Sequence, residues 1–287
     1  MPLAFNSERH ACAMSDMPTG NPLPPEGVNA PRGTGLGEFV RVIIGLIVLT
    51  VLVTGGLILG ARWLAPLIPF HWERSVAQSF EPSEQVGNAS ADKALQQLAS
   101  ELIADANLPE GMTIDVHLVP NEVPNAFATL GGQVMINRGL LDHVDSENGL
   151  AMVLAHEIAH IRERHPIQAM SRGAVLALVF AVASGTTGEE AISSVLGQAG
   201  LMTALSFNRD MEREADSIAL AILRRHYGHT RGAGEFFRSM QQEDSAPVWT
   251  TLLRTHPRSQ ERLEAMAQRR RVDDAERQPM PEALDSL

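Results

Sequence analysis

The stretch that decides the fold reads Leu154-Ala155-His156-Glu157-Ile158-Ala159-His160. On a helix, residues four apart differ by about 40° in direction and by about 6 Å along the axis. His156 and His160 therefore project side by side and can hold one metal ion, typically zinc, through their imidazole nitrogens. Glu157 points about 100° away, where it can reach a water on the metal without binding the metal itself. This pattern predicts a metal site with a general base beside it.

The surrounding sequence predicts a helix over Glu147–Arg164, with Ser146 as its N-cap and Pro166 as its stop. Most of this helix is apolar, so we expect it to be buried. Histidines and a glutamate on a buried helix need polar partners or a metal. The alternative, a surface helix with two unrelated histidines, does not account for these apolar residues.

A third protein ligand is needed to leave one metal position open for water. His165 is the nearest candidate, but on a continuous helix it lies about 180° round from His156, so we expect a helix-end residue favoured by the dipole. Glu212 and Asp216 lie on a predicted helix, Met211–His226, one turn apart. One carboxylate can bind the metal while the other fixes the tautomer of a histidine. A solvated acidic face is the alternative interpretation.

The rest of the chain from about residue 75 to 272 predicts a domain of helices with a small sheet. The expected helices are Ala89–Ala106, Arg231–Gln242 and Ser259–Arg271. The expected strands are Thr113–Val119, Asn125–Thr129 and Gln133–Asn137, the last two joined around the turn signal Gly131-Gly132.

Ahead of this domain, Val42–Ala61 is a run of twenty residues without charge. Twenty helical residues span about 30 Å, the thickness of the hydrocarbon core of a membrane. Arg41 and Arg62 bracket the run, so we expect a transmembrane helix over residues 39–62. A cleaved signal peptide fits poorly, because its charged region and its apolar core would both be too long. Charge does not decide the orientation, since two arginines lie close on each side.

The flanks and one internal region are expected to differ from the domain core. Residues 1–38 are rich in proline and glycine and predict a disordered tail, and residues 273–287 predict a loose one. The apolar stretches Ala174–Ala183 and Ala191–Asn208 are short or partly polar for membrane spans. We expect core helices or an amphipathic lid there, with a membrane-inserted hairpin as the alternative.

Composition excludes several classes of protein. The formal net charge of -11 argues against a nucleic-acid partner, which favours a basic face. Cys12 is the only cysteine, so neither an internal disulfide nor a cysteine zinc site is possible. No pattern supports an organic cofactor.

Four blocks of the sequence stand out in chain order. The first is Asn125-Ala126-Phe127-Ala128 followed by Gly131-Gly132 and Asn137-Arg138-Gly139-Leu140-Leu141. The second is the helix from His156 to His165, and the third is Glu212-x-Glu214-Ala215-Asp216. A weaker fourth block is Thr255-His256-Pro257 with Arg262 downstream. Together these blocks resemble the M48 family of zinc metallopeptidases, which includes the HtpX-like heat-shock proteases and the CAAX prenyl proteases.

The resemblance implies an α+β, mostly helical, zincin-like fold of the gluzincin type. It implies that His156, His160 and Glu212 bind one Zn²⁺ and that Glu157 activates the water. Asp216 would hold one of the ligand histidines. Arg209 and Arg262 would pair with carboxylates of the site, with a structural ion pair as the alternative. His256 would stabilise the oxyanion or bind zinc in a resting state, with a packed loop histidine as the alternative. The substrate-binding residues would be Asn125, Ala126 and Phe127, on a strand to which an extended peptide adds.

The expected function is therefore zinc-dependent endopeptidase activity on polypeptides, such as misfolded or envelope proteins. By analogy we expect a single-pass protein of the bacterial inner membrane with a periplasmic domain, the cytoplasmic face being the alternative. The alternative functions are a membrane-tethered, chaperone-like binding module and an autoinhibited protease. In the autoinhibited form, residues 174–208 would be the lid and His256 would block the metal.

Overall fold

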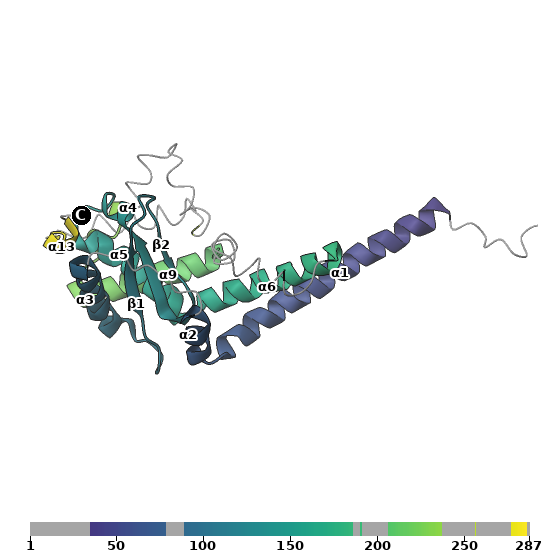
Figure 1. Ribbon diagram of the computed structural model, residues 1–287, viewed down its shortest axis with the longest axis horizontal. Coiled ribbons are helices and arrows are strands. Elements are labelled where there is room, and N and C mark those ends of the chain that lie inside the picture. Colours follow the sequence, from purple (N-terminus) through teal and green to yellow (C-terminus); the bar gives the residue numbers. More distant parts are fainter. Residues whose placement is uncertain are drawn as a thin grey trace, which may run out of the picture. The chain divides into compact units, whose positions relative to one another are not determined.

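The computed structural model describes residues 35–78, 89–185, 190, 206–236, 256 and 277–285 (Figure 1). The chain divides into two compact units, Met1–Val51 and Leu52–Leu287. The expected tail before residue 35, the helix over residues 259–271 and Arg262 lie outside the described residues, as does most of the region between residues 186 and 205.

The first helix, α1 (Leu36–Leu64), contains the predicted transmembrane segment. None of its residues is buried, and it is long and apolar enough to cross a membrane. Its 29 residues span about 44 Å at 1.5 Å per residue. A short 3-10 helix, η1 (Ala65–Leu67), and the helix α2 (Phe70–Gln78) follow it.

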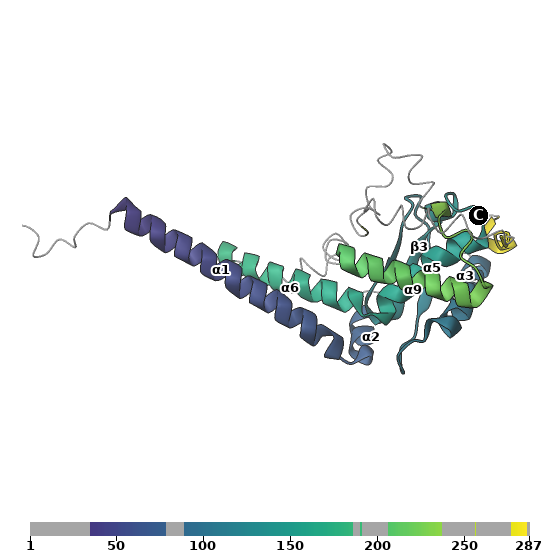
Figure 2. The ribbon, with the colours of Figure 1, turned by 180° about the vertical axis from the view of Figure 1, so that it is seen from behind.

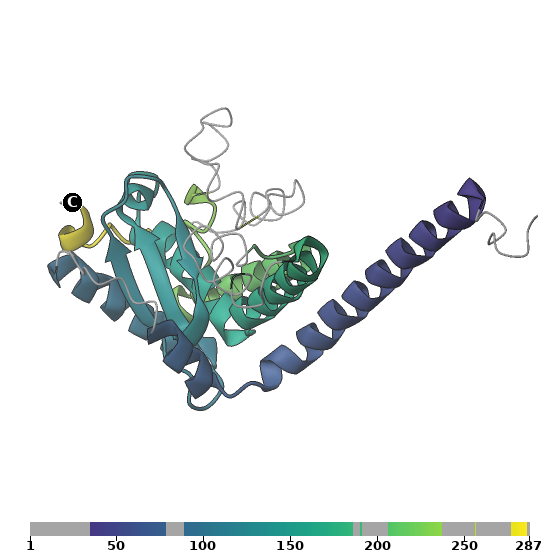
Figure 3. The same cartoon turned by 45° about the vertical axis from the view of Figure 1, so that its right-hand side comes forward.

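The predicted sheet is present, and its strands are drawn as arrows in Figure 3. The three strands lie in the order β1-β3-β2. Strand β1 (Asp115–Val119) pairs with β3 (Gln133–Asn137) in parallel, and β2 (Ala126–Ala128) pairs with β3 in antiparallel fashion. The short turn η2 (Leu130–Gly132) joins β2 to β3, and both of its glycines have positive φ angles. A Cβ atom on Gly132 would lie 2.0 Å from the carbonyl oxygen of Thr113, so no other residue fits there without a shift.

Helices cover one face of this sheet. Helix α5 (Glu147–Arg162) packs against β2, against α3 (Ala89–Ala106) and against α9 (Arg209–Tyr227). Seen from behind, α9 runs beside α5 (Figure 2). The alternating side chains of β1 and β3 supply the sheet's share of the core, namely Val116, Leu118, Val134 and Ile136. The predicted fold class, mostly helical with a small sheet, is therefore confirmed.

The two edge strands of the sheet, β1 and β2, differ in the hydrogen bonding of their outer main-chain groups. Side chains of α3 occupy the outer edge of β1, where Gln96 Oε1 accepts from the Val116 amide at 2.8 Å and Asp92 Oδ1 accepts from the Leu118 amide at 3.0 Å. Strand β2 forms the opposite edge, and within the described residues no strand pairs with its outer side. A sheet edge left in this way is a template for another extended chain.

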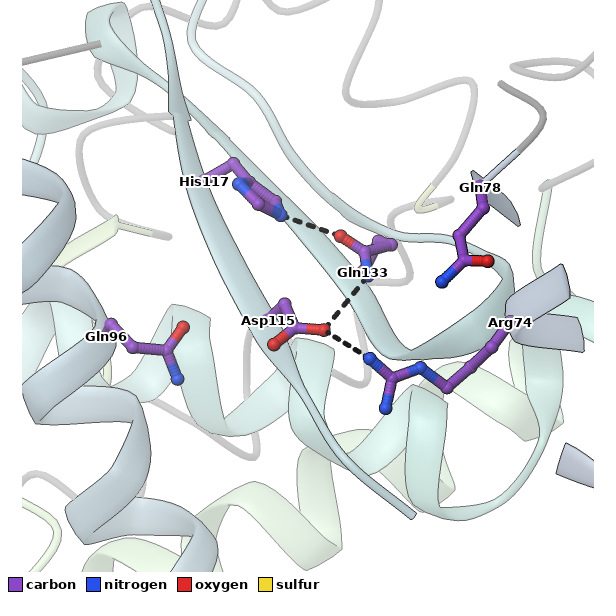
Figure 4. Close-up of a pocket in the computed structure, with 6 residues that line it drawn as sticks. All are labelled: Arg74, Gln78, Gln96, Asp115, His117 and Gln133. Carbon is purple, nitrogen blue, oxygen red and sulfur yellow. Dashed lines mark hydrogen bonds and ion pairs between the residues drawn. The ribbon is translucent and has the colours of Figure 1, made fainter. Parts of the chain in front are cut away.

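The face of the sheet away from the core is polar at one end (Figure 4). Gln133 bridges the strands there, since its amide nitrogen donates to Asp115 Oδ2 at 3.1 Å and its Oε1 lies 2.7 Å from His117 Nε2. The Arg74 guanidinium donates to the same Asp115 carboxylate at 3.4 Å. These groups satisfy one another and tie α2 to the sheet.

Helix α5 begins as predicted but ends earlier. Ser146 Oγ accepts from the Gly149 amide at 3.2 Å, which confirms the N-cap. The helix stops at Arg162, and Arg164 then takes a left-handed conformation with φ 60°. Pro166 is not the stop of α5, as the sequence suggested, because it lies in the first turn of the next helix, α6 (His165–Ser184). Proline is well tolerated there, since first-turn amides have no partner within the helix.

Arg164 is held in this conformation by the segment that follows α1. Its Nε donates to Glu73 Oε1 at 2.9 Å, and its guanidinium donates to the carbonyl oxygen of Ile68 at 2.6 Å. Glu73 is buried and also accepts from the Gly131 amide at 3.4 Å. Burial raises the pKa of the Glu73 carboxyl, and the ion pair with Arg164 opposes that effect. The corner between α5 and α6 is thus fixed to α2 and to the β2–β3 turn.

Residues 277–285, the described part of the expected loose tail over residues 273–287, pack on the domain. Helix α13 (Glu282–Asp285) buries Leu284 in the core. The Gln278 amide donates to Asn148 Oδ1 at 2.7 Å, and Arg277 pairs with the buried Glu235 at 2.6 Å.

Of the two apolar stretches noted in the sequence, residues 174–183 belong to α6. The C-terminal half of this helix exposes large apolar side chains, namely Leu176, Leu178, Phe180 and Val182.

Candidate metal centre

The packing of α5 against α9 brings the predicted ligands together. His156 and His160 come from α5, and Glu212 comes from the first turn of α9, directly opposite. His256 approaches from a distant part of the chain. All four side chains are buried, and one potential ligand atom from each lies within 4.8 Å of all the others.

The individual distances describe a compact cluster. The Nε2 atoms of His156 and His160 lie 3.0 Å apart. The Glu212 carboxylate faces both, with Oε2 3.6 Å from His156 Nε2 and Oε1 3.5 Å from His160 Nε2. The two histidines and the glutamate therefore converge on one point from two helices, as the spacing in the sequence predicts for His156 and His160.

His256 links this cluster to Glu157. Its Nδ1 lies 3.0 Å from Glu212 Oε1, and its Nε2 lies 3.6 Å from Glu157 Oε1. Both His256 Nε2 and Glu157 Oε2 are buried without a hydrogen-bond partner in the described part of the chain. Unsatisfied buried polar atoms are costly, so they mark a place where a ligand or water belongs.

The electrostatics of the cluster suit a cation. Burial opposes protonation of His156, but the carboxylates of Asp216 and Glu212 outweigh that effect and raise the pKa of His156 to about 10. Burial would raise the pKa of Glu212, but the nearby His256 and the other histidines hold it well below its usual range. Burial lowers the pKa of His160 well below 6.5, which keeps its imidazole neutral.

The donor set also fits a divalent metal. Two imidazoles and one carboxylate form a ligand set used by catalytic zinc sites, which leave a fourth position open. An ionised Glu212 and a neutral His160 present the lone pairs that such an ion needs. The carboxylates of Asp216 and Glu212, which raise the pKa of His156, favour a positive charge at this point.

The far nitrogens of both helix histidines lie close to polar atoms of other residues. His156 Nδ1 lies 3.0 Å from Asp216 Oδ1, where the sequence placed a supporting carboxylate. His160 Nδ1 lies 2.9 Å from His165 Nδ1. The ring of Phe207 stacks on the ring of His160, with centroids 4.0 Å apart and planes inclined by 19°. The sequence analysis did not identify Phe207.

The expectation for His165 is corrected. It is not a residue at the C-terminal end of α5, because the left-handed turn at Arg164 ends the helix geometry on which that argument rested. His165 instead starts α6, is buried, and turns back against His160. A helix start disfavours a positive charge, so the dipole argument does not apply either.

The remaining predicted residues lie in or next to β2 and at the start of α9. Asn125 and Ala126 are buried and Phe127 is half-buried at the edge strand β2, which contacts α5. Arg209 is exposed at the start of α9 and forms no ion pair with a carboxylate of the cluster among the described residues.

The sequence comparisons agree with this site. Residues 89–270 match the family described as Peptidase family M48. The chain is 34% identical over 170 residues to the mitochondrial metalloendopeptidase OMA1 of Saccharomyces cerevisiae, covering 57% of this chain and 49% of the relative. It is 31% identical over 184 residues to the beta-barrel assembly-enhancing protease of Yersinia pestis, covering 59% of this chain and 37% of that one.

The corresponding protease of Escherichia coli K12 is 31% identical over 183 residues, with the same coverage of 59% and 37%. The chain thus spans half or less of the length of these relatives. The match to the family nevertheless covers more than half of this chain and includes both cluster-bearing helices. The chain belongs to peptidase family M48.

Proposed function

We propose that this chain is a zinc-dependent endopeptidase in which His156, His160 and Glu212 hold one Zn²⁺. The observation that carries the proposal is the convergence of buried potential ligands from α5, α9 and residue 256 within 4.8 Å. Two imidazoles and a carboxylate match a catalytic zinc site, since three protein ligands leave a place for water or substrate. The proposed catalytic domain covers residues 75–272, behind one membrane-spanning helix.

The chain's own residues would divide the chemistry of peptide hydrolysis. A zinc ion in this cluster would polarise the scissile carbonyl and lower the pKa of the attacking water. Glu157 accepts the proton of that water and then gives it to the leaving amine. Its burial beside the cluster, 2% exposed, and its unpartnered Oε2 support this role. His256 would donate to the developing oxyanion through Nε2, which lies 3.6 Å from Glu157 and has no hydrogen-bond partner among the described residues.

The substrate would bind as an extended strand along β2. The Asn137 amide donates to the Asn125 carbonyl at 2.9 Å and the Thr129 amide donates to the Gln133 carbonyl at 2.8 Å, so these residues face β3. In an antiparallel pair every second residue directs its main-chain groups away from the partner strand. Ala126 and Ala128 alternate with Asn125 and Thr129, so their amides and carbonyls face the outer edge of β2, a strand that contacts α5.

The proposed setting is the bacterial inner membrane, with a single span and the catalytic domain in the periplasm. The apolar helix α1 supports a membrane anchor. Misfolded or envelope proteins are the proposed substrates, since two of the relatives are named as beta-barrel assembly-enhancing proteases. An extended, unfolded segment is also what an open strand edge can accept.

A second candidate, an autoinhibited protease, rests on His256. Because His256 is close enough to act as a fourth ligand, it would close the metal position that catalysis needs. In that case His256 would have to move away from the metal before substrate could bind.

The test is to measure zinc per chain and cleavage of an unfolded protein by the full chain in detergent. Wild type should contain one zinc, should cleave, and should lose cleavage when a chelator removes the metal. The Glu212→Ala and His160→Ala variants should lose both the zinc and the cleavage. A wild-type chain that cleaves after complete removal of metal would rule the proposal out.

A further inference from the structure

His165 is a buried polar side chain that the proposed reaction does not use. It is 2% exposed, and both of its ring nitrogens have neighbours. Its Nδ1 lies 2.9 Å from Nδ1 of His160, and its Nε2 lies 3.4 Å from Glu214 Oε2. It therefore stands between a proposed zinc ligand and a carboxylate of α9.

The backbone sets this position. The left-handed conformation of Arg164 breaks the direction of α5, and α6 begins at once with His165. Arg164 cannot relax easily, because the buried Glu73 carboxylate and the carbonyl of Ile68 hold its side chain. The ring of His165 is thus delivered to His160 by a constrained corner.

The two rings can be assigned hydrogens in only one consistent way if His160 binds a metal. His160 directs Nε2 at the cluster, so that nitrogen must keep its lone pair and Nδ1 must carry the hydrogen. That hydrogen then needs an acceptor, and Nδ1 of His165 is the atom 2.9 Å away. His165 in turn carries its own hydrogen on Nε2, on the side of Glu214.

We propose that His165 is a positioning residue that accepts a hydrogen bond from Nδ1 of His160 and so fixes the tautomer and rotation of this ligand. The inference rests on the proposed zinc site. His165 would do for His160 what the Asp216 carboxylate does for His156, namely hold the ring nitrogen that faces away from the metal. Partners of this kind orient metal ligands, and losing one typically lowers metal affinity about 10- to 100-fold.

Phe207 and His165 constrain different motions of the same ring. The stacked ring of Phe207 fixes the plane of the His160 imidazole. Stacking permits a 180° flip about the Cβ–Cγ bond, which keeps the ring plane, and a hydrogen bond at Nδ1 favours one of the two orientations. Glu214 is about half exposed, so water can replace part of its contribution.

The experiment measures the zinc dissociation constant of the full chain by competition with a chelator of known affinity. His165→Phe and His165→Leu both remove the acceptor, so either one suffices if the other does not fold. We expect about 10- to 100-fold weaker zinc binding. His165→Asn places an amide oxygen where Nδ1 was and should bind within about threefold of wild type.

His226→Phe is the matched control. This histidine is partly buried on α9 and contacts Asp105, away from the cluster, so its loss should leave zinc affinity unchanged. Equal zinc affinity in wild type and the acceptor-free variants would overturn the role of His165 and leave the proposed function intact. The same holds if His165→Asn loses as much zinc affinity as His165→Phe and His165→Leu. A wild-type chain that binds no zinc would overturn this inference together with the proposed function.

Discussion

Oδ1 of Asp216 lies 3.0 Å from Nδ1 of His156, while Glu212, one turn earlier on the same helix, lies 3.6 Å from Nε2 of the same imidazole. Helix α9 thus supplies one carboxylate to each ring nitrogen of His156. The spacing of four residues accomplishes this because it places two carboxylates on one face of α9. Glu212 can then bind a metal while Asp216 holds the ligand ring.

Replacing Asp216 with Asn should weaken zinc binding about 10- to 100-fold, because the neutral amide stabilises the His156 ring less than a carboxylate does. The measurement is the zinc dissociation constant by chelator competition. Asp210→Asn is the control, since this carboxylate lies on the same helix but is exposed and pairs with Arg213. Equal affinities in both variants would show that Asp216 does not support the ligand.

Replacing His256 with Ala should lower kcat by about 10²- to 10³-fold and leave zinc bound, if this histidine stabilises the oxyanion. The relevant contacts are Glu212 at 3.0 Å and Glu157 at 3.6 Å. Steady-state kinetics with metal content measured in parallel separates the two proposed roles. Higher activity in the variant would favour the autoinhibited protease instead.

Backbone methylation of a peptide substrate should reveal the strand pairing at β2. Ala126 and Ala128 direct their main-chain groups outward, so every second substrate amide should donate to them. Methylating those amides should lower kcat/KM by about 3- to 10-fold each, the net value of one hydrogen bond. Methylating the amides between them should have little effect, and a loss without this alternation would contradict the proposed binding mode.

The turn between β2 and β3 should not tolerate a side chain at Gly132. Its φ is 81°, and a Cβ would lie 2.0 Å from the Thr113 carbonyl oxygen. Gly132→Ala should therefore lower the free energy of unfolding by about 3 kcal/mol or more. Gly111 is the matched control, because its φ is 79° with nothing within 4 Å of an added Cβ. Gly111→Ala should cost about 1 kcal/mol in urea unfolding, and equal losses would show that the contact with Thr113 is not responsible.

Local sequence patterns predicted much of the fold. The alternation of Thr113–Val119 and the run Gln133–Asn137 predicted two strands, the first of which starts at Asp115 in the structure, and Ser146 predicted the start of α5. These features depend on neighbours in the sequence, which explains the success. The parallel pairing of β1 with β3 was not predictable in this way, because it depends on how the chain crosses between them.

The surroundings of the candidate site show where such reasoning stops. The argument against His165 treated the helix as continuous, and one left-handed residue, Arg164, invalidated it. That conformation is held by Glu73, 91 residues earlier in the chain. Phe207 had no signal either, since an apolar residue before a helix is unremarkable until its ring is found against His160.

The most direct test of the account compares wild type with Glu157→Gln for zinc per chain and for cleavage of an unfolded protein. Glu157 lies next to the cluster without being part of the proposed ligand set, so both proteins should contain one zinc. Cleavage should be present in wild type and absent in the variant, because glutamine cannot accept the proton of the attacking water. Turnover by the variant would contradict the central claim that Glu157 is the general base of a zinc peptidase.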